Sequence, residues 1–216
     1  MKKTFVILLT FSFVLSTNAQ DPDVLKAREI LEKVSVKTKT YSTIRADFSI
    51  TLENLQANLT DTYSGKIIMK GDKYKIDVMN TEIFSDGKTL WTYMPEAYEV
   101  NVSDVSMMEN SLLDPAKIFT VYESGFKYIY AGETTINGKK VDIVDLFPEK
   151  RDQIYSRIKV FIYRDNLQIA KLLQIGRDGN NYYIDINKME INTPADDSIF
   201  KFDATKFPGV EVIDLR

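Results

Sequence analysis

The sequence predicts a mainly β fold of the α+β class, in which one N-terminal helix precedes a strongly curved antiparallel sheet. Apolar residues recur at spacings of three and four once, near the N-terminus, and apolar and polar residues then alternate along most of the chain. Pairs such as Asp86-Gly87 and Asn137-Gly138 separate the alternating runs and supply the positive φ angles of tight hairpins. So many strands favour a curved sheet or an incomplete barrel, because a flat open sheet would leave long exposed edges.

The first twenty residues have the three-part pattern of a secretory signal peptide. Lys2 and Lys3 precede an apolar run over residues 5–15, and small residues follow up to Ala19. The apolar run is shorter than the roughly twenty residues that span a bilayer. We therefore expect residues 1–20 to be removed and residues 21–216 to form a single exported, soluble domain.

The remaining elements follow in order. A helix is expected to begin at the N-cap Asp21, with Pro22 in its first turn, and to end near Val36. Residues 106–124 interrupt the later alternation and contain a proline, so one or two short helices are expected there as a lid or plug. Strands are expected at residues 44–52, 63–69, 74–78, 90–93, 98–102, 126–131, 141–147, 158–163, 167–175 and 182–191.

The composition disfavours most enzymatic and metal sites. The chain has no histidine and no cysteine, so Ser-His-Asp and Cys-His arrangements and zinc sites built from these residues are excluded. A carboxylate pair stays open as an alternative, although the acidic residues lie mainly in turns and on polar strand faces. We expect neither a cofactor nor a metal. The net charge of −3 also disfavours nucleic acid as a partner.

A specific motif occupies residues 85–95, which read Ser-Asp-Gly-Lys-Thr-Leu-Trp-Thr-Tyr-Met-Pro. It resembles the S-D-G-K-T-L-W-x-Y-x-P hairpin of the periplasmic outer-membrane lipoprotein carrier family, LolA. The resemblance extends over most of residues 21–216. It includes a helix before Ala46-x-Phe48, Gly65-Lys66-Ile67, Leu112-Leu113, and Phe200-x-Phe202 followed by Pro208-Gly209-Val210-Glu211-Val212.

This resemblance implies an unclosed barrel covered by short lid helices and no enzymatic activity. It implies a periplasmic carrier whose hydrophobic interior receives the acyl chains of lipoproteins from an inner-membrane release transporter and delivers them outward. The outer-membrane acceptor stays unknown, and we expect the carrier to be a monomer. Residues 16–20 contain no cysteine for a lipid anchor, which favours the soluble shuttle over an anchored receptor of the same fold.

Two positions depart from the family pattern. The family commonly has an arginine that steadies the lid directly after the lysine of the second strand, whereas Lys70 is followed here by Gly71. A frequent glutamine of the first strand is replaced by Ile50. Candidates for holding a closed lid are therefore Lys70, Lys73 and Arg45.

A lipid-binding cavity would be lined by one parity of each strand, together with the lid. Filled cores and cavity walls share the same alternation, so a filled-core protein-interaction domain and a carrier or sensor of another lipid stay open as alternatives. The parity of the strand at 90–93 is also open. The expected lining residues are Ile50, Leu52, Ile67, Met69, Tyr74, Ile76, Trp91 and Tyr93. The expected lid residues are Met107, Met108, Leu112, Leu113, Ile118 and Phe119.

Overall fold

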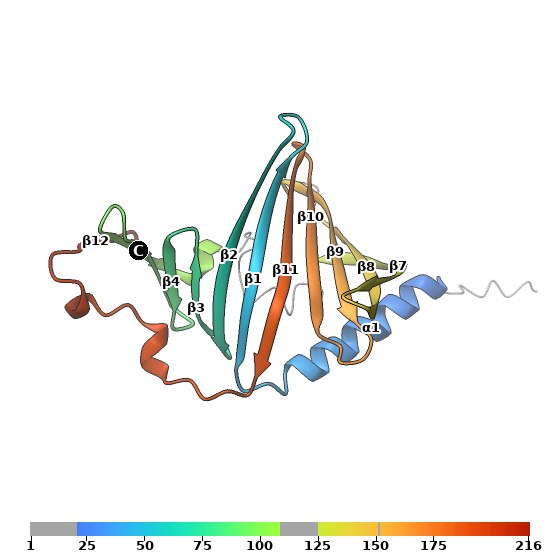
Figure 1. Ribbon diagram of the computed structural model, residues 1–216, viewed down its shortest axis with the longest axis horizontal. Coiled ribbons are helices and arrows are strands. Elements are labelled where there is room, and N and C mark those ends of the chain that lie inside the picture. The colour runs from blue at the N-terminus through green and yellow to red at the C-terminus, as the bar shows by residue number, and fades with distance from the viewer. Residues whose placement is uncertain (1–20, 109–124, 151) are drawn as a thin grey trace, which may run out of the picture.

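The computed structural model describes residues 21–108, 125–150 and 152–216. The described chain forms one twelve-stranded sheet that curves without closing into a barrel, accompanied by one α-helix (Figure 1). The predicted fold class is thereby confirmed. The predicted signal peptide and most of the predicted lid lie outside the described residues.

The helix α1, Pro22–Thr38, begins and ends close to where the sequence predicts. The Asp21 carboxylate accepts a hydrogen bond from the backbone N–H of Asp23 at 2.9 Å, and Pro22 occupies the first turn. Its apolar stripe packs on one face of the sheet, which we call the inner face. The buried residues of this stripe are Ala27, Leu31 and Val34.

The sheet consists of two runs of sequential hairpins that meet where β1 pairs with β11. The strand order is β12-β6-β5-β4-β3-β2-β1-β11-β10-β9-β8-β7, and every pairing is antiparallel except that of β12 with β6. The strands are β1 Ile44–Asn54, β2 Leu59–Lys70, β3 Lys73–Val78, β4 Thr81–Ser85, β5 Thr89–Met94, β6 Glu99–Asp104, β7 Phe126–Ile136, β8 Lys139–Pro148, β9 Tyr155–Tyr163, β10 Ile169–Gly176, β11 Asn180–Ile191 and β12 Glu211–Asp214. Short 3-10 helices are η1 Val105–Met108, η3 Asp197–Phe200 and η4 Ala204–Lys206.

Two strands, β4 and β12, are absent from the sequence prediction. In β4 the adjacent residues Ile83 and Phe84 point to opposite faces and both pack against apolar neighbours, so the strand shows no alternation. β12 spans only four residues and pairs in parallel with a strand far away in sequence. Short or doubly covered strands give little periodic signal.

One large buried cluster occupies the inner face. Cross-strand partners lie on the same face of a sheet, and apolar partners follow one another across β1, β2 and β3, as in Ala46 with Ile67 and Ile67 with Ile76. The other half of the sheet continues the cluster through Val144, Val160 and Leu172. The inner-face cluster therefore joins both halves of the sheet to α1.

A C-terminal arm, residues 192–210, crosses from one half of the sheet to the other. It leaves β11, runs past the lower ends of β1–β3 in Figure 1 and reaches the edge where β12 joins β6. Its rings Phe202 and Phe207 pack on Phe84 and Tyr93 in a second cluster, on the face opposite α1. Strands β4 and β5 are therefore covered on both faces, by the inner-face cluster and by the arm.

Candidate functional site

The inner face brings together six of the eight predicted lining residues. Five of them are buried in the inner-face cluster, and Leu52 packs against the cluster while remaining partly exposed. All six come from β1, β2 and β3, where period-two alternation gives the correct parity. The five buried residues are Ile50, Ile67, Met69, Tyr74 and Ile76.

Trp91 and Tyr93 lie on the outer face, apart from the other six. In β5 the inward-pointing neighbour is Leu90, which belongs to the inner-face cluster. Tyr93 packs instead on the arm, with its ring centroid 5.3 Å from that of Phe202 and 4.7 Å from that of Phe207. The sequence left the parity of this strand open, and in the structure β5 turns both aromatic residues away from the inner face.

The hairpin of residues 85–95 has a clear structural role. The Asp86 carboxylate accepts hydrogen bonds from the backbone N–H groups of Lys88 and Thr89 at 3.1 and 2.9 Å, and Gly87 has φ of +90°. Burial acts to raise the pKa of Asp86, but these bonds and the charge of Lys201 lower it on balance. Lys201 of the arm lies 3.6 Å from the Asp86 carboxylate. Two motifs more than a hundred residues apart in sequence thus meet, and together they fix the arm.

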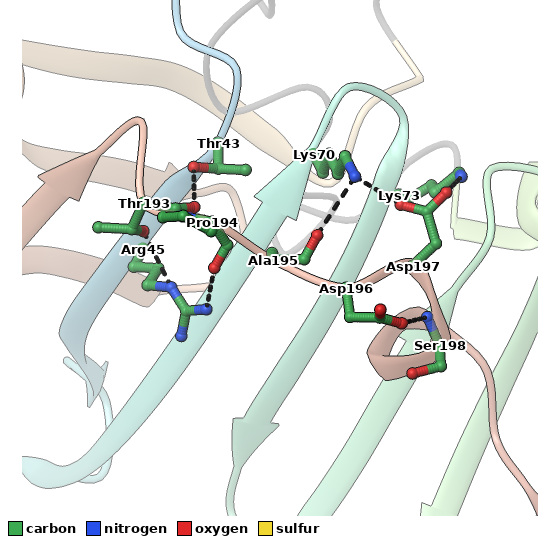
Figure 2. A network of polar contacts seen from close by, with 10 residues as sticks. All are labelled: Thr43, Arg45, Lys70, Lys73, Thr193, Pro194, Ala195, Asp196, Asp197 and Ser198. Carbon is green, nitrogen blue, oxygen red and sulfur yellow. Dashed lines mark hydrogen bonds and ion pairs between the residues drawn. The ribbon is translucent and has the colours of Figure 1, made fainter.

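The three cations proposed to hold a lid contact the arm, and the predicted lid partners lie outside the described residues (Figure 2). Arg45 donates hydrogen bonds to the side chain of Thr193 and to the carbonyl of Pro194, at 3.0 and 3.1 Å. Lys70 and Lys73 share the carboxylate of Asp197, at 2.7 and 2.5 Å. Among the described residues these cations therefore fasten the arm to the ends of β1, β2 and β3.

We predict that the Asp197 carboxyl titrates with a pKa of about 2, because hydrogen bonds from Lys70 and Lys73 favour its charged form. An unfolded chain restores a pKa of about 3.9, so the ion pairs stabilise the fold above about pH 4 and lose this effect as the pH falls through about 2. Carboxyl NMR titration measures the value. In the Lys70→Met/Lys73→Met variant it should return toward the ordinary value; an unchanged low pKa there would refute the assignment.

A polar network at the other end of the inner face was not predicted. Arg28 of α1 donates to the hydroxyl of Tyr128 at 3.0 Å, and the ammonium of Lys26 lies 3.5 Å from the ring centroid of Tyr130. Tyr130 in turn donates to Asp142 at 3.0 Å. These contacts tie α1 to β7 and β8. No spacing in the sequence indicates them, because the partners are about a hundred residues apart.

The outer face has a shallow hollow of about 300 Å³ where β1 meets β2 and β11. Charged side chains of both signs dominate its lining: Arg45, Asp47, Lys66, Lys188 and Glu190. Charged groups resist removal from water, so this hollow does not suit an acyl chain. The large apolar cluster of the sheet lies on the opposite, inner face.

The lid prediction falls mostly beyond what the structure describes. The backbone of Met107 and Met108 forms the end of η1, whereas Leu112, Leu113, Ile118 and Phe119 lie outside the described residues. Over the described ranges, no group of three or more acidic side chains is arranged to hold a metal ion. No helix in the same ranges is long and apolar enough to cross a membrane.

Comparisons with known proteins agree with this geometry. An outer-membrane lipoprotein carrier protein from Pasteurella multocida (strain Pm70) is 29% identical over 221 residues, covering 99% of this chain and 96% of that protein. Another, from Shewanella sp. (strain W3-18-1), is 23% identical over 204 residues, covering 91% of this chain and 88% of its own length.

Two solved structures share the fold at low sequence identity. An uncharacterized conserved protein from Thermus thermophilus has a TM-score of 0.58 at 8% identity, covering 88% of this chain and 99% of that chain. A DUF1329 family protein from Desulfovibrio piger ATCC 29098 has a TM-score of 0.53 at 14% identity, covering 85% and 99%. The family model described as outer membrane lipoprotein carrier protein LolA matches residues 39–203. The chain therefore belongs to the LolA family of outer membrane lipoprotein carrier proteins.

Proposed function

We propose that this protein is a periplasmic carrier that binds the acyl chains of lipoproteins against its inner face and moves them from the inner to the outer membrane. The observation that carries the proposal is the continuous apolar inner face, which extends from β3 through β1 and β11 to β8 under a single helix. The similarity to outer-membrane lipoprotein carrier proteins supports lipoproteins as the cargo class. The protein acts by binding and release and catalyses no reaction.

Release of the cargo has to overcome the large favourable free energy of burying its acyl chains. Burial of a methylene group is worth about 0.8 kcal/mol, so a fully buried sixteen-carbon chain gains at most about 12 kcal/mol. We propose that the lid segment, Met107 to Val121, occupies the acyl site when cargo is absent and is displaced when cargo enters. Closure of the lid then offsets part of the gain and permits transfer.

Leu52 and Thr51 provide a matched test, because these neighbours on β1 point to opposite faces. Leu52 packs against the inner-face cluster, whereas Thr51 bonds to Thr62 on the outer face through their hydroxyl groups at 2.9 Å. Leu52→Glu places a charge beside the proposed acyl site, and we expect at least about a tenfold loss of affinity for a fluorescent fatty-acid probe, since each tenfold corresponds to about 1.4 kcal/mol.

The matched variant Thr51→Glu should bind the probe as the wild type does. Circular dichroism checks that both variants stay folded; Leu52 is only partly buried, so its replacement leaves the buried rows intact. Equal affinities in the two variants would remove the inner face as the acyl site.

Material that co-purifies with the protein from its native envelope identifies the cargo. Triacylated lipoprotein, detected by mass spectrometry, supports the carrier function, with an inner-membrane release transporter as donor. Free glycolipid or another free lipid would favour the alternative, in which the protein carries a lipid other than lipoprotein. A protein partner with no acylated material would favour an interaction domain with a filled core.

A further inference from the structure

Three aliphatic side chains stand exposed at one end of the sheet. Leu55, Leu59 and Ile154 are 60%, 61% and 70% exposed, while the inner-face cluster a few residues away is buried. Leu55 and Leu59 flank the turn between β1 and β2, which projects beyond the other strands at the top of Figure 1 with the β10–β11 hairpin beside it. We call the two hairpin turns and Ile154 the apical tip.

Backbone and side-chain bonds hold the apical tip in one shape. The backbone N–H of Leu55 donates to the carbonyl of Gly179 at 2.9 Å, and the side chains of Asn54 and Asn180 are bonded at 2.9 Å. The backbone N–H of Arg177 donates to the carbonyl of Ile154, also at 2.9 Å. The aliphatic side chains are therefore presented by bonded turns that hold them away from the core.

Within the apical tip, the β1–β2 turn is free of charge, whereas the β10–β11 turn beside it carries Arg177 and Asp178. Residues 54–60 read Asn-Leu-Gln-Ala-Asn-Leu-Thr and contain no charged residue, in a chain of which 27% is charged. Exposed turns in such a chain ordinarily carry charge, because charge keeps a surface soluble. An uncharged turn with two leucines can enter the interfacial region of a membrane without removing an ion from water.

We propose that the apical tip docks on the surface of a zwitterionic phospholipid bilayer by inserting Leu55, Leu59 and Ile154 into its interfacial region. A protein partner fits less well. Binding hot spots favour Trp, Tyr and Arg over Leu, and a stable dimer needs about 800 Å² from each partner, more than one narrow projection supplies. A fluid bilayer adapts to a convex tip. The inference rests on the proposed carrier function in one respect: a carrier collects acyl chains from one bilayer and delivers them to another.

The absence of cysteine permits a direct test. Leu55→Cys and the control Val36→Cys each give a single labelling site; Val36 is 69% exposed and lies in α1, away from the apical tip. Each carries an environment-sensitive fluorophore, and phosphatidylcholine vesicles are added. We expect the emission at position 55 to shift to shorter wavelength and to be quenched by a lipid-borne quencher, with no change at position 36. No shift at 55, or equal shifts at both positions, overturns the proposal.

A second variant separates this inference from the carrier function. Leu55→Ser/Leu59→Ser should lose most of its vesicle-bound fraction in flotation while binding the fatty-acid probe as the wild type does, because neither residue belongs to the inner-face cluster. Unchanged flotation of the variant refutes the membrane docking and leaves the carrier function standing. If the wild type does not bind the probe, the carrier function is refuted and the docking stands. A change in oligomeric state, measured by size-exclusion chromatography, would make the tip a protein interface and overturn the proposal.

Discussion

Truncation of Phe200 to alanine is expected to lower the free energy of unfolding by about 3–5 kcal/mol, the cost of removing a large ring from a closed site. Phe200 ends η3 in the C-terminal arm and is fully buried, although the arm lies at the periphery of the fold. η3 lies against β3 and β4, so the ring fixes the arm to the half of the sheet that carries the 85–95 hairpin. Chemical denaturation measures the change.

Phe147→Ala is the matched control, since this ring on β8 is 39% exposed. Its truncation should cost much less, because a half-exposed ring leaves no closed cavity. Equal destabilisation by the two substitutions would show that the arm packs only loosely. A lower m-value in the Phe200 variant, with a smaller loss of free energy, would show that the arm detaches before the sheet unfolds.

Replacement of Gly176 by alanine is expected to cost about 3 kcal/mol or more, at or above the upper range for overpacking. A Cβ atom there would lie 2.1 Å from the backbone oxygen of Asn180 and 2.6 Å from a carboxylate oxygen of Asp178. Backbone cannot move aside as a flexible side chain can, so the β10–β11 turn has to shift. Thermal denaturation measures the effect.

The control for Gly176 is Gly71→Ala. Gly71 has φ of +57°, and a Cβ atom there would meet nothing within 4 Å. Only the left-handed backbone conformation opposes the substitution, at a cost of roughly 1–2 kcal/mol. If the Gly71 variant is the less stable of the two, the clash at Gly176 does not govern the turn.

Local patterns account for most of the fold. Asp21 and Pro22 mark the start of α1, and the alternation in β1, β2 and β3 places Ile50, Ile67 and Ile76 on the inner face. In these elements the local chemistry and the tertiary environment demand the same residue types. Parity fails as a guide in β5, because both of its faces are covered and apolar residues occupy adjacent positions.

The arm could not be located from sequence, although its residues are conspicuous. Phe200, Phe202 and Phe207 occur without a repeating period, and their partners lie on strands far away in the chain. The sequence also does not identify Asp197 as the partner of Lys70 and Lys73, because any carboxylate in the chain could pair with these cations. Contacts between distant segments depend on topology, which local spacing does not encode. The lid residues stay a prediction, as do the lipid contacts of the inner face.

The pairing of β1 with β11 also determines how the chain can fold. β1 spans residues 44–54 and its partner β11 spans residues 180–191, so the pairing that joins the two halves of the sheet connects segments far apart in sequence. Closing so long a loop before any contact compensates for the lost entropy slows folding, and sheets dominated by distant pairings are slow folders. In a polypeptide that leaves the ribosome N-terminus first, β1 can pair with β2 early, but its other edge stays unpaired until β11 has been synthesised.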